Sequence, residues 1–265
     1  MRIGCQIGIW KGGEFEANIA AIGRSGVRGL ETFASQLKPY HANPAAFRAL
    51  LAGAGLRLSG AYFNSKDFID PGAEEAVVAE TAGDCAFLRA VGGEFLVVNG
   101  GVWKGDEPRT FSAEDFRQLA KVLNRIGGEA ARQGVRAVVH PHVKCMVETP
   151  ADVDRLVAAG LDRGKIGLCV HASHQVLAGA DPYAIYEKYG AWVEYAHIGE
   201  ADAAGKGTFL GQGVLDQKRL MRPLLDACFD GWIVIECGKE GVSSQDYVRD
   251  AMSYLKAAWP AVRWE

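Results

Sequence analysis

The sequence lacks several features that would place it in other classes of protein. Its 265 residues contain no linker or low-complexity segment. No run of about 18 apolar residues could cross a membrane, and no basic segment precedes an apolar stretch at the N-terminus, as a secretion signal would require. We therefore expect a soluble, cytoplasmic protein in which residues 1–265 form a single domain.

Clustered basic charge is also absent. The chain has 29 Lys and Arg against 32 Asp and Glu, a net charge of −3, and these residues are spread without long runs. Binding to a nucleic acid or a membrane surface would need clustered basic charge, so neither is expected as a partner. A small-molecule ligand is the expectation, while a homo-oligomer and a complex with a partner subunit both remain open.

The six cysteines have no Cys-x-x-Cys spacing. Four of them lie inside or just after apolar runs, where cysteine acts as a small buried apolar residue. A disulfide framework is therefore not expected.

What the sequence does contain is a repeated alternation of apolar runs with amphipathic stretches. Runs that are apolar on both faces are typical of parallel strands, and eight of them in 265 residues predict a closed (β/α)₈ TIM barrel. The predicted strands are 3–9, 27–33, 56–63, 95–99, 136–142, 166–171, 193–198 and 232–236. The predicted helices are 15–24, 43–54, 73–90, 112–133, 149–160, 181–189, 216–228 and 243–258.

Polar side chains end most of the predicted strands. The carboxyl ends of barrel strands converge on one face, where the active site lies. Five of the six histidines are at these ends, which as a group indicates a site better than five separate structural histidines. A carboxylate at the end of an apolar run is costly to bury unless it is paired or bound to metal. The polar strand ends are Trp10, Glu31, Asn64, Asn99, His140 with His142, His171 with His174, His197 and Glu236.

Two His and two Glu from adjacent strands could bind a cation such as Mn²⁺, Co²⁺ or Zn²⁺. Open positions on the metal would take substrate oxygens, and a nearby His or Glu could move a proton from a carbon next to a carbonyl. Other roles stay open for several candidates. Asn64 and Asn99 could satisfy loop backbone, Glu31 could be a capping or rim charge, and Lys144 and Glu200 could face solvent.

The segment His140-Pro141-His142, followed by Met146-Val147-Glu148-Thr149, resembles the inosose dehydratase branch of the xylose isomerase-like TIM barrels. Gly29-Leu30-Glu31 is similar to that family's Gly-x-Glu, and the resemblance spans essentially the whole chain. It implies a sugar isomerase, epimerase or dehydratase with a divalent metal, most commonly Mn²⁺, with Co²⁺, Zn²⁺ or Mg²⁺ as alternatives.

The resemblance also implies roles for individual residues. The implied metal ligands are Glu148, His171, His197 and Glu236. His140 stands where most isomerases and epimerases have a strand Glu, and the family's usual Asp-x-x-His is here His171-Ala172-Ser173-His174. After His197, Gly199-Glu200 replaces the usual Lys-Asp pair. His142 or His140 is the expected base, and the expected substrate-binding residues are Glu31, Asn64, Asn99, Lys144 and His174.

The reaction itself has more than one interpretation. The His-rich pocket suits proton abstraction from a keto-cyclitol or keto-sugar. Related barrels are also subunits that eliminate an aglycone from a 3-keto-glycoside, or the barrel could bind a sugar without catalysis. A nuclease of the endonuclease IV type is disfavoured by the net charge and the few carboxylates at strand ends. Loops 65–71 and 101–108 should set specificity.

Overall fold

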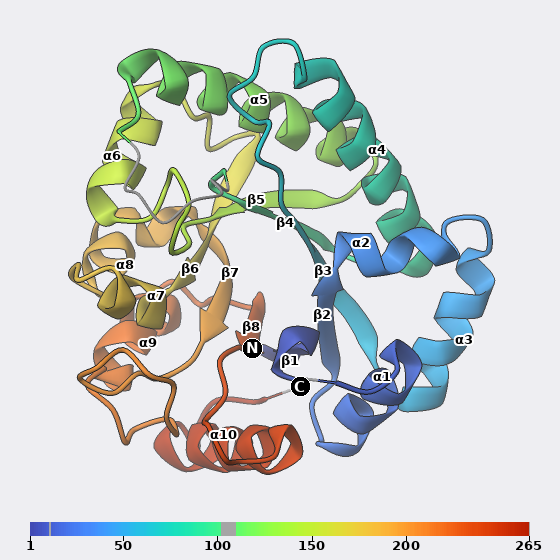
Figure 1. Ribbon diagram of the computed structural model, residues 1–265. Helices are drawn as coiled ribbons and strands as arrows, with labels where there is room; N and C mark the ends of the chain where they lie inside the picture. The colour runs from blue at the N-terminus through green and yellow to red at the C-terminus, as the bar shows by residue number, and fades with distance from the viewer. Residues whose placement is uncertain (11, 102–109, 265) are drawn as a thin grey trace.

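The computed structural model describes residues 1–10, 12–101 and 110–264, and in it eight parallel strands form one closed barrel (Figure 1). Each strand pairs with the next in the chain, and β8 pairs with β1, so the predicted TIM barrel is confirmed. Most of the loop expected at 101–108 lies outside the described residues. The strands are β1 (Arg2–Gln6), β2 (Gly29–Phe33), β3 (Arg57–Phe63), β4 (Phe95–Asn99), β5 (Arg136–His140), β6 (Ile166–His171), β7 (Val193–Ile198) and β8 (Trp232–Ile235).

The helices form a ring outside the strands (Figure 1). No helix in the described part of the chain combines the length and apolar character needed to span a membrane. The helices are α1 (Phe15–Arg24), α2 (Ala34–Leu37), α3 (Pro44–Ala54), α4 (Glu74–Val91), α5 (Ala113–Arg132), α6 (Pro150–Ala158), α7 (Ala172–Leu177), α8 (Ala184–Tyr189), α9 (Gln217–Asp226) and α10 (Ser244–Ala258), with 3₁₀ turns η1 (Ile7–Ile9), η2 (Lys38–Tyr40) and η3 (Gly190–Trp192).

Capping residues explain why several helix ends were predicted within one or two residues. Asn43 accepts a hydrogen bond from the backbone N–H of Ala46, and Pro44 begins α3. That helix ends at Gly55, whose φ of 66° is a left-handed conformation that glycine adopts without strain. Ser112 and Thr149 begin α5 and α6 in the same way, each in a capping box.

Two predicted strands end at least two residues earlier in the structure. β1 ends at Gln6, because the Gln6 side chain accepts a hydrogen bond from the Gly8 backbone and turns the chain into η1. β5 ends at His140, because Pro141 has no N–H to continue the ladder. The chain then folds back on itself, and the His142 backbone N–H donates to the Val147 carbonyl. His142 is therefore a loop residue rather than a strand residue.

Two short helices, α2 and α7, were not predicted. Each follows its strand directly, and neither begins with a side-chain hydrogen bond to a first-turn amide from Ser, Thr, Asp or Asn. The pattern therefore offered no start signal. The consequence matters for α7, because it places His174 one helical turn after His171 on the same face.

Two apolar cores hold the barrel. One lies between strands and helices, and the other fills the barrel interior with residues that include Tyr62, Tyr195 and Trp232. Trp232 closes the amino end, where Arg2 and Arg57 lie 4.7 and 5.2 Å from its ring centre. Side chains therefore fill the barrel interior at its amino end, and a ligand can reach only the carboxyl ends of the strands.

A buried carboxylate connects α4 to α5. Glu74 is 5% exposed and accepts hydrogen bonds from Gln118 at 3.0 Å, Lys121 at 2.8 Å and Arg125 at 2.5 Å. The contacts with Lys121, Arg125 and Gln118 lower the pKa of Glu74 to about 2. Because the folded pKa lies below the unfolded one, this group stabilises the fold above the unfolded pKa and loses that effect as pH falls toward 2.

We predict that Glu74→Gln lowers the free energy of unfolding by about 1–3 kcal/mol at pH 7, because it weakens the charge-assisted hydrogen bonds that this buried side chain accepts from Lys121 and Arg125. The difference from the unmodified protein should shrink as the pH falls toward 3. Urea unfolding at both pH values measures it. Glu75→Gln is the matched control, because Glu75 also binds Arg125 but its side chain is 83% exposed. Equal losses in the two variants would contradict the prediction.

Candidate functional site

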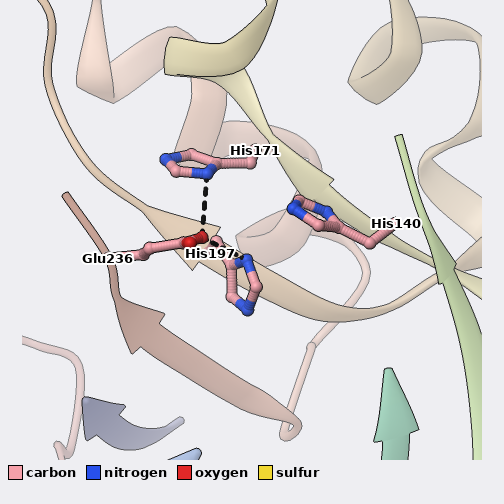
Figure 2. Close-up of side chains that lie close together, drawn as sticks. All are labelled: His140, His171, His197 and Glu236. Atoms are coloured by element: carbon pink, nitrogen blue, oxygen red, sulfur yellow. Dashed lines mark ion pairs between the residues drawn. The ribbon is translucent and has the colours of Figure 1, made fainter. Parts of the chain in front are cut away.

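Four side chains from adjacent strands meet at the carboxyl end of the barrel (Figure 2). His140, His171 and His197 are the last or next-to-last residues of β5, β6 and β7, and Glu236 directly follows β8. Register pairs His171 with His197. One ligand atom from each of the four lies within 4.8 Å of all the others.

Within the described part of the chain, each of these residues has one buried polar atom without a hydrogen-bond partner. The atoms are His140 Nε2, His171 Nδ1, His197 Nδ1 and Glu236 Oε2. Glu236 Oε2 forms ion pairs with His171 Nδ1 at 3.0 Å and His197 Nδ1 at 2.6 Å. Apart from these two ion pairs, the four ligand atoms have no polar partner in the described residues, which is unusual for buried polar groups. They suit a divalent cation, so the residues present fit a metal.

The opposite nitrogen of each imidazole already has a partner. His140 Nδ1 lies 3.2 Å from the Cys169 carbonyl oxygen, so it donates and leaves the lone pair on Nε2. His171 Nε2 lies 2.6 Å from Ser173 Oγ.

His197 Nε2 lies 2.8 Å from Glu31 Oε2, and both side chains are fully buried. The carboxylate can only accept, so His197 Nε2 carries a proton, and the Nδ1 lone pair becomes available to a cation when the Nδ1 proton that faces Glu236 Oε2 leaves. Metal-binding histidines are normally oriented by such outer contacts.

Electrostatics differ among these side chains. Although burial lowers it, the pKa of His171 is raised to about 9 by Cys237 and Glu236, and that of His197 is raised well above its usual range by Cys169, Glu31 and Glu236, so a cation that binds here displaces a proton from each.

Burial would raise the pKa of Glu236, but His197 and His171 outweigh it and hold that pKa well below its usual range, so the carboxylate is ionised. Burial lowers the pKa of His140 and of His174, which keeps both imidazoles neutral. Neutral imidazole and ionised carboxylate are the forms that bind metal.

A second group of histidines adjoins the first. His140, His142 and His174 also have ligand atoms within 4.8 Å of one another. The ring centres of His142 and His174 are 4.2 Å apart, and those of His171 and His174 are 4.0 Å apart. His142 Nδ1 donates to the Val143 carbonyl at 2.8 Å, which leaves the Nε2 lone pair free as a base. Burial lowers the pKa of His142, so it is neutral at pH 7.

The structure does not bring Glu148 into either group of ligand atoms in the described residues. Glu148 Oε1 instead accepts from the Lys144 backbone N–H at 3.1 Å, and its backbone carbonyl accepts from Gln175. Lys144 is exposed and has a left-handed φ of 57°. Of the four implied ligands, His171, His197 and Glu236 meet, and His140 lies where Glu148 was expected.

The other predicted site residues are dispersed. Asn64 is exposed, and Asn99 uses its side-chain oxygen to accept from the Gly101 backbone, as the loop-backbone alternative proposed. Glu200 is fully buried rather than solvent-facing. Its carboxylate accepts from the backbone N–H of Ala201, Gly211 and Leu215, so it holds the Gly-rich loop after β7.

A cavity of about 970 Å³ opens beside the four-residue cluster. Glu236 forms part of its wall and its side chain is 20% exposed. Phe33, at the end of β2, forms part of another wall, and the remaining lining comes mainly from the loop 237–244. A substrate could therefore reach Glu236 from this cavity.

Three residues near the site were not singled out from the sequence. Ser173 contacts His171, and Cys237 Sγ lies 3.4 Å from Ser173 Oγ and 3.5 Å from His171 Nε2. Phe33 lines the cavity. Ser173 could have been found from its place between two histidines, but nothing in the local sequence marks Cys237 or Phe33.

A parallel barrel with imidazoles and a carboxylate gathered at the carboxyl ends of its strands is the architecture of TIM-barrel enzymes. The chain belongs to the xylose isomerase-like TIM barrel family, whose sequence model matches residues 19–258. The predicted family is thereby confirmed.

Relatives of known activity agree with this placement. The chain is 26% identical over 272 residues to an inosose dehydratase of Lacticaseibacillus casei, covering 92% of this chain and 89% of the relative. It is also 26% identical to an inosose dehydratase of Geobacillus thermodenitrificans, covering 92% and 90%.

Solved structures show the same fold. A 3-keto-D-glucoside 4-epimerase from E. coli superimposes with a TM-score of 0.75 at 21% identity, covering 97% of this chain and 99% of that one. A D-psicose 3-epimerase gives 0.79 at 16% identity, covering 97% and 99%.

We predict that Glu31→Gln weakens metal binding about 10–100-fold, because it replaces the carboxylate that orients His197 and fixes its proton on Nε2. Calorimetric titration of the metal-free protein with Zn²⁺ or Co²⁺ measures the dissociation constant. Glu240→Gln is the control, because Glu240 is an exposed carboxylate of the same cavity. If both variants bind equally well, His197 does not depend on Glu31.

Proposed function

We propose that residues 1–265 form a single-domain, cytoplasmic enzyme that abstracts a proton next to the carbonyl of a keto-cyclitol or keto-sugar. The reaction is a dehydration or a related isomerisation. The observation that carries the proposal is the set of four ligand atoms on His140, His171, His197 and Glu236, which lie within 4.8 Å of one another and lack a hydrogen-bond partner in the described residues. The similarity to inosose dehydratases supports the substrate class.

These four residues would hold a divalent cation. Bound there, the cation supplies a Lewis acid that polarises a substrate carbonyl and makes the neighbouring C–H bond more acidic. Mn²⁺ was the expectation from the family resemblance. Three imidazoles with one carboxylate favour Zn²⁺, Co²⁺ or Fe²⁺ over Mg²⁺ and Ca²⁺, which prefer oxygen ligands.

The chain's own groups then divide the remaining work. His142 is the proposed base, because its Nε2 lone pair is free and its ring adjoins the cluster. His140 was the other expected base, but its one free nitrogen, Nε2, belongs to the ligand set. In a dehydration His142 takes the proton, the C–H electron pair forms the double bond, and the hydroxyl on the next carbon leaves as water with a proton. His174 is a second proton carrier beside His142.

One experiment separates the two candidate fourth ligands. We predict that His140→Gln loses most of the bound metal and that Glu148→Gln keeps it. Of these two residues, His140 belongs to the cluster that contains Glu236, and Glu148 does not. Elemental analysis after dialysis gives metal per chain, and circular dichroism checks folding. Stripping the unmodified protein with a chelator should abolish turnover, and restored metal should restore it. Full activity without metal would refute the proposal, and metal loss in Glu148→Gln alone would return the fourth ligand to Glu148.

We predict that His142→Gln lowers kcat about 10²–10⁴-fold, the usual contribution of a general base, while metal content stays unchanged. The direct measurement is exchange of the substrate's α-proton with solvent deuterium. His41→Gln is the matched control, because His41 is the one histidine away from the strand ends and stacks on Phe87 outside the barrel. Normal exchange in His142→Gln would assign the base to another residue.

A further inference from the structure

We infer that Gly199, the residue directly after β7, is what allows an imidazole to serve as the cation ligand from β6, and that this position thereby contributes to the choice of cation. The inference rests on the proposed function, since it concerns the cation that His171 would bind. Three observations support it, namely the lack of space at Gly199, the fixed surroundings of that residue and the shape of the His171 ring.

A side chain at residue 199 would have no room among the described residues. A Cβ placed there would lie 2.7 Å from the Glu236 carbonyl oxygen, 2.9 Å from His171 Nε2 and 3.1 Å from Cys237 Sγ. Non-bonded carbon atoms prefer a separation of about 3.5–4.0 Å, so at least one neighbour would have to move. Gly199 is not among the glycines with positive φ, so the closeness of its neighbours, rather than its backbone conformation, requires glycine here.

The backbone around Gly199 is held in place. The Gly199 carbonyl accepts a hydrogen bond from Gln217 Nε2 at 3.1 Å, and the Ile198 carbonyl accepts one from the Glu236 N–H at 3.0 Å. On the other side, the buried Glu200 carboxylate accepts from three backbone N–H groups of the loop that follows β7. Because the chain is fixed before and after residue 199, an added methyl group would press on its neighbours rather than move away from them.

The His171 ring has little freedom to move aside. Its side chain is fully buried, and its Nε2 lies 2.6 Å from Ser173 Oγ. Its ring centre is 4.0 Å from that of His174, and its Nδ1 lies 3.0 Å from Glu236 Oε2. Since an imidazole is rigid, a methyl group that displaces Nε2 would also change the position of Nδ1, the atom that faces the cluster.

The ligand atom itself does not need the space at Gly199. In histidine Nδ1 is bonded to Cγ, as Oδ1 is in aspartate, so an aspartate at residue 171 could offer an oxygen where His171 offers Nδ1. The atom of His171 that meets residue 199 is Nε2, at the far end of the ring, and aspartate has no such atom. Gly199 is therefore required by the imidazole and not by the presence of a ligand on β6.

This difference bears on the choice of cation. With His171, the cluster has three imidazoles and one carboxylate, whereas an aspartate at that residue would give two of each. Imidazole ligands suit Zn²⁺, and carboxylate ligands suit Mn²⁺ and Mg²⁺. By admitting the imidazole, Gly199 shifts the preference of the site toward Zn²⁺ and away from Mn²⁺.

The test is a double-mutant cycle in which Zn²⁺ and Mn²⁺ are titrated by calorimetry into the metal-free unmodified protein, Gly199→Ala, His171→Asp and the double variant. We expect Gly199→Ala to weaken Zn²⁺ binding about 10–100-fold when residue 171 is histidine, the usual effect of disturbing what orients a metal ligand. When residue 171 is aspartate, the same substitution should cost less than about threefold, because the two changes no longer interact. His171→Asp alone should lower the ratio of Zn²⁺ to Mn²⁺ affinity.

Gly190→Ala is the matched control. Gly190 is half-buried, has a φ of −51° and lies in η3, before the amino end of β7. A Cβ there would meet Pro223 Cβ at 3.6 Å, an ordinary contact, so the Zn²⁺ affinity should stay unchanged. The midpoint of thermal unfolding of the metal-free proteins is a second readout. His171→Asp should also relieve any loss of stability that Gly199→Ala causes, so the test remains decisive if the single variant folds poorly.

The outcomes separate this inference from the proposed function. An equal loss of Zn²⁺ affinity from Gly199→Ala with either residue at position 171 would trace the effect to the Glu236 carbonyl oxygen. That result, or an unchanged affinity in Gly199→Ala, would overturn the inference and leave the proposed function intact. An unmodified protein that binds neither cation would refute the cation of the proposed function, and the inference with it.

Discussion

The negative charge of Glu236 is the constraint around which the site is arranged. An ionised carboxylate with only 20% of its side chain exposed must be compensated, or the fold would bear a desolvation cost of several kcal/mol. His171 and His197 compensate it at 3.0 and 2.6 Å. Both pairs share the single oxygen Oε2, and neither histidine nitrogen has a further partner in the described structure. A cation between these atoms would compensate the negative charge of Glu236 more completely than protons on the two histidines alone.

The packing below the site makes this geometry rigid. The barrel interior is close-packed from Trp232, at the amino end of β8, toward the site, and this packing leaves the strand ends little freedom to move. Each imidazole is fixed a second time by its outer partner. Glu31 does this for His197 from β2, a strand that does not neighbour β7 in the barrel. Positioning therefore comes from tertiary contacts between distant strands, which is the usual requirement for a preorganised site.

The difference between local signals and distant contacts also explains which features could be predicted from the sequence. Strands and most helices could be predicted because apolar runs and capping residues such as Asn43 and Ser112 are local signals. The convergence of His171, His197 and Glu236 followed from the barrel rule alone. The expectation for Glu148 depended on the shape of the loop after β5, where the chain turns at Pro141 and its carboxylate meets the Lys144 backbone. No periodicity encodes that turn.

The two histidines of the loop and of α7 show how such local changes alter chemistry. Because β5 stops at His140, the next histidine is displaced from the strand end and keeps a free Nε2 lone pair beside the cluster. Because α7 begins directly after His171, His174 is brought within 4.2 Å of His142 between ring centres. The proposed metal ligands and the proposed proton-transfer pair thus lie side by side while sharing no ionisable atom. With a cation bound, His142 would be able to change its protonation state during a reaction without releasing a ligand, which a base inside the ligand set could not do.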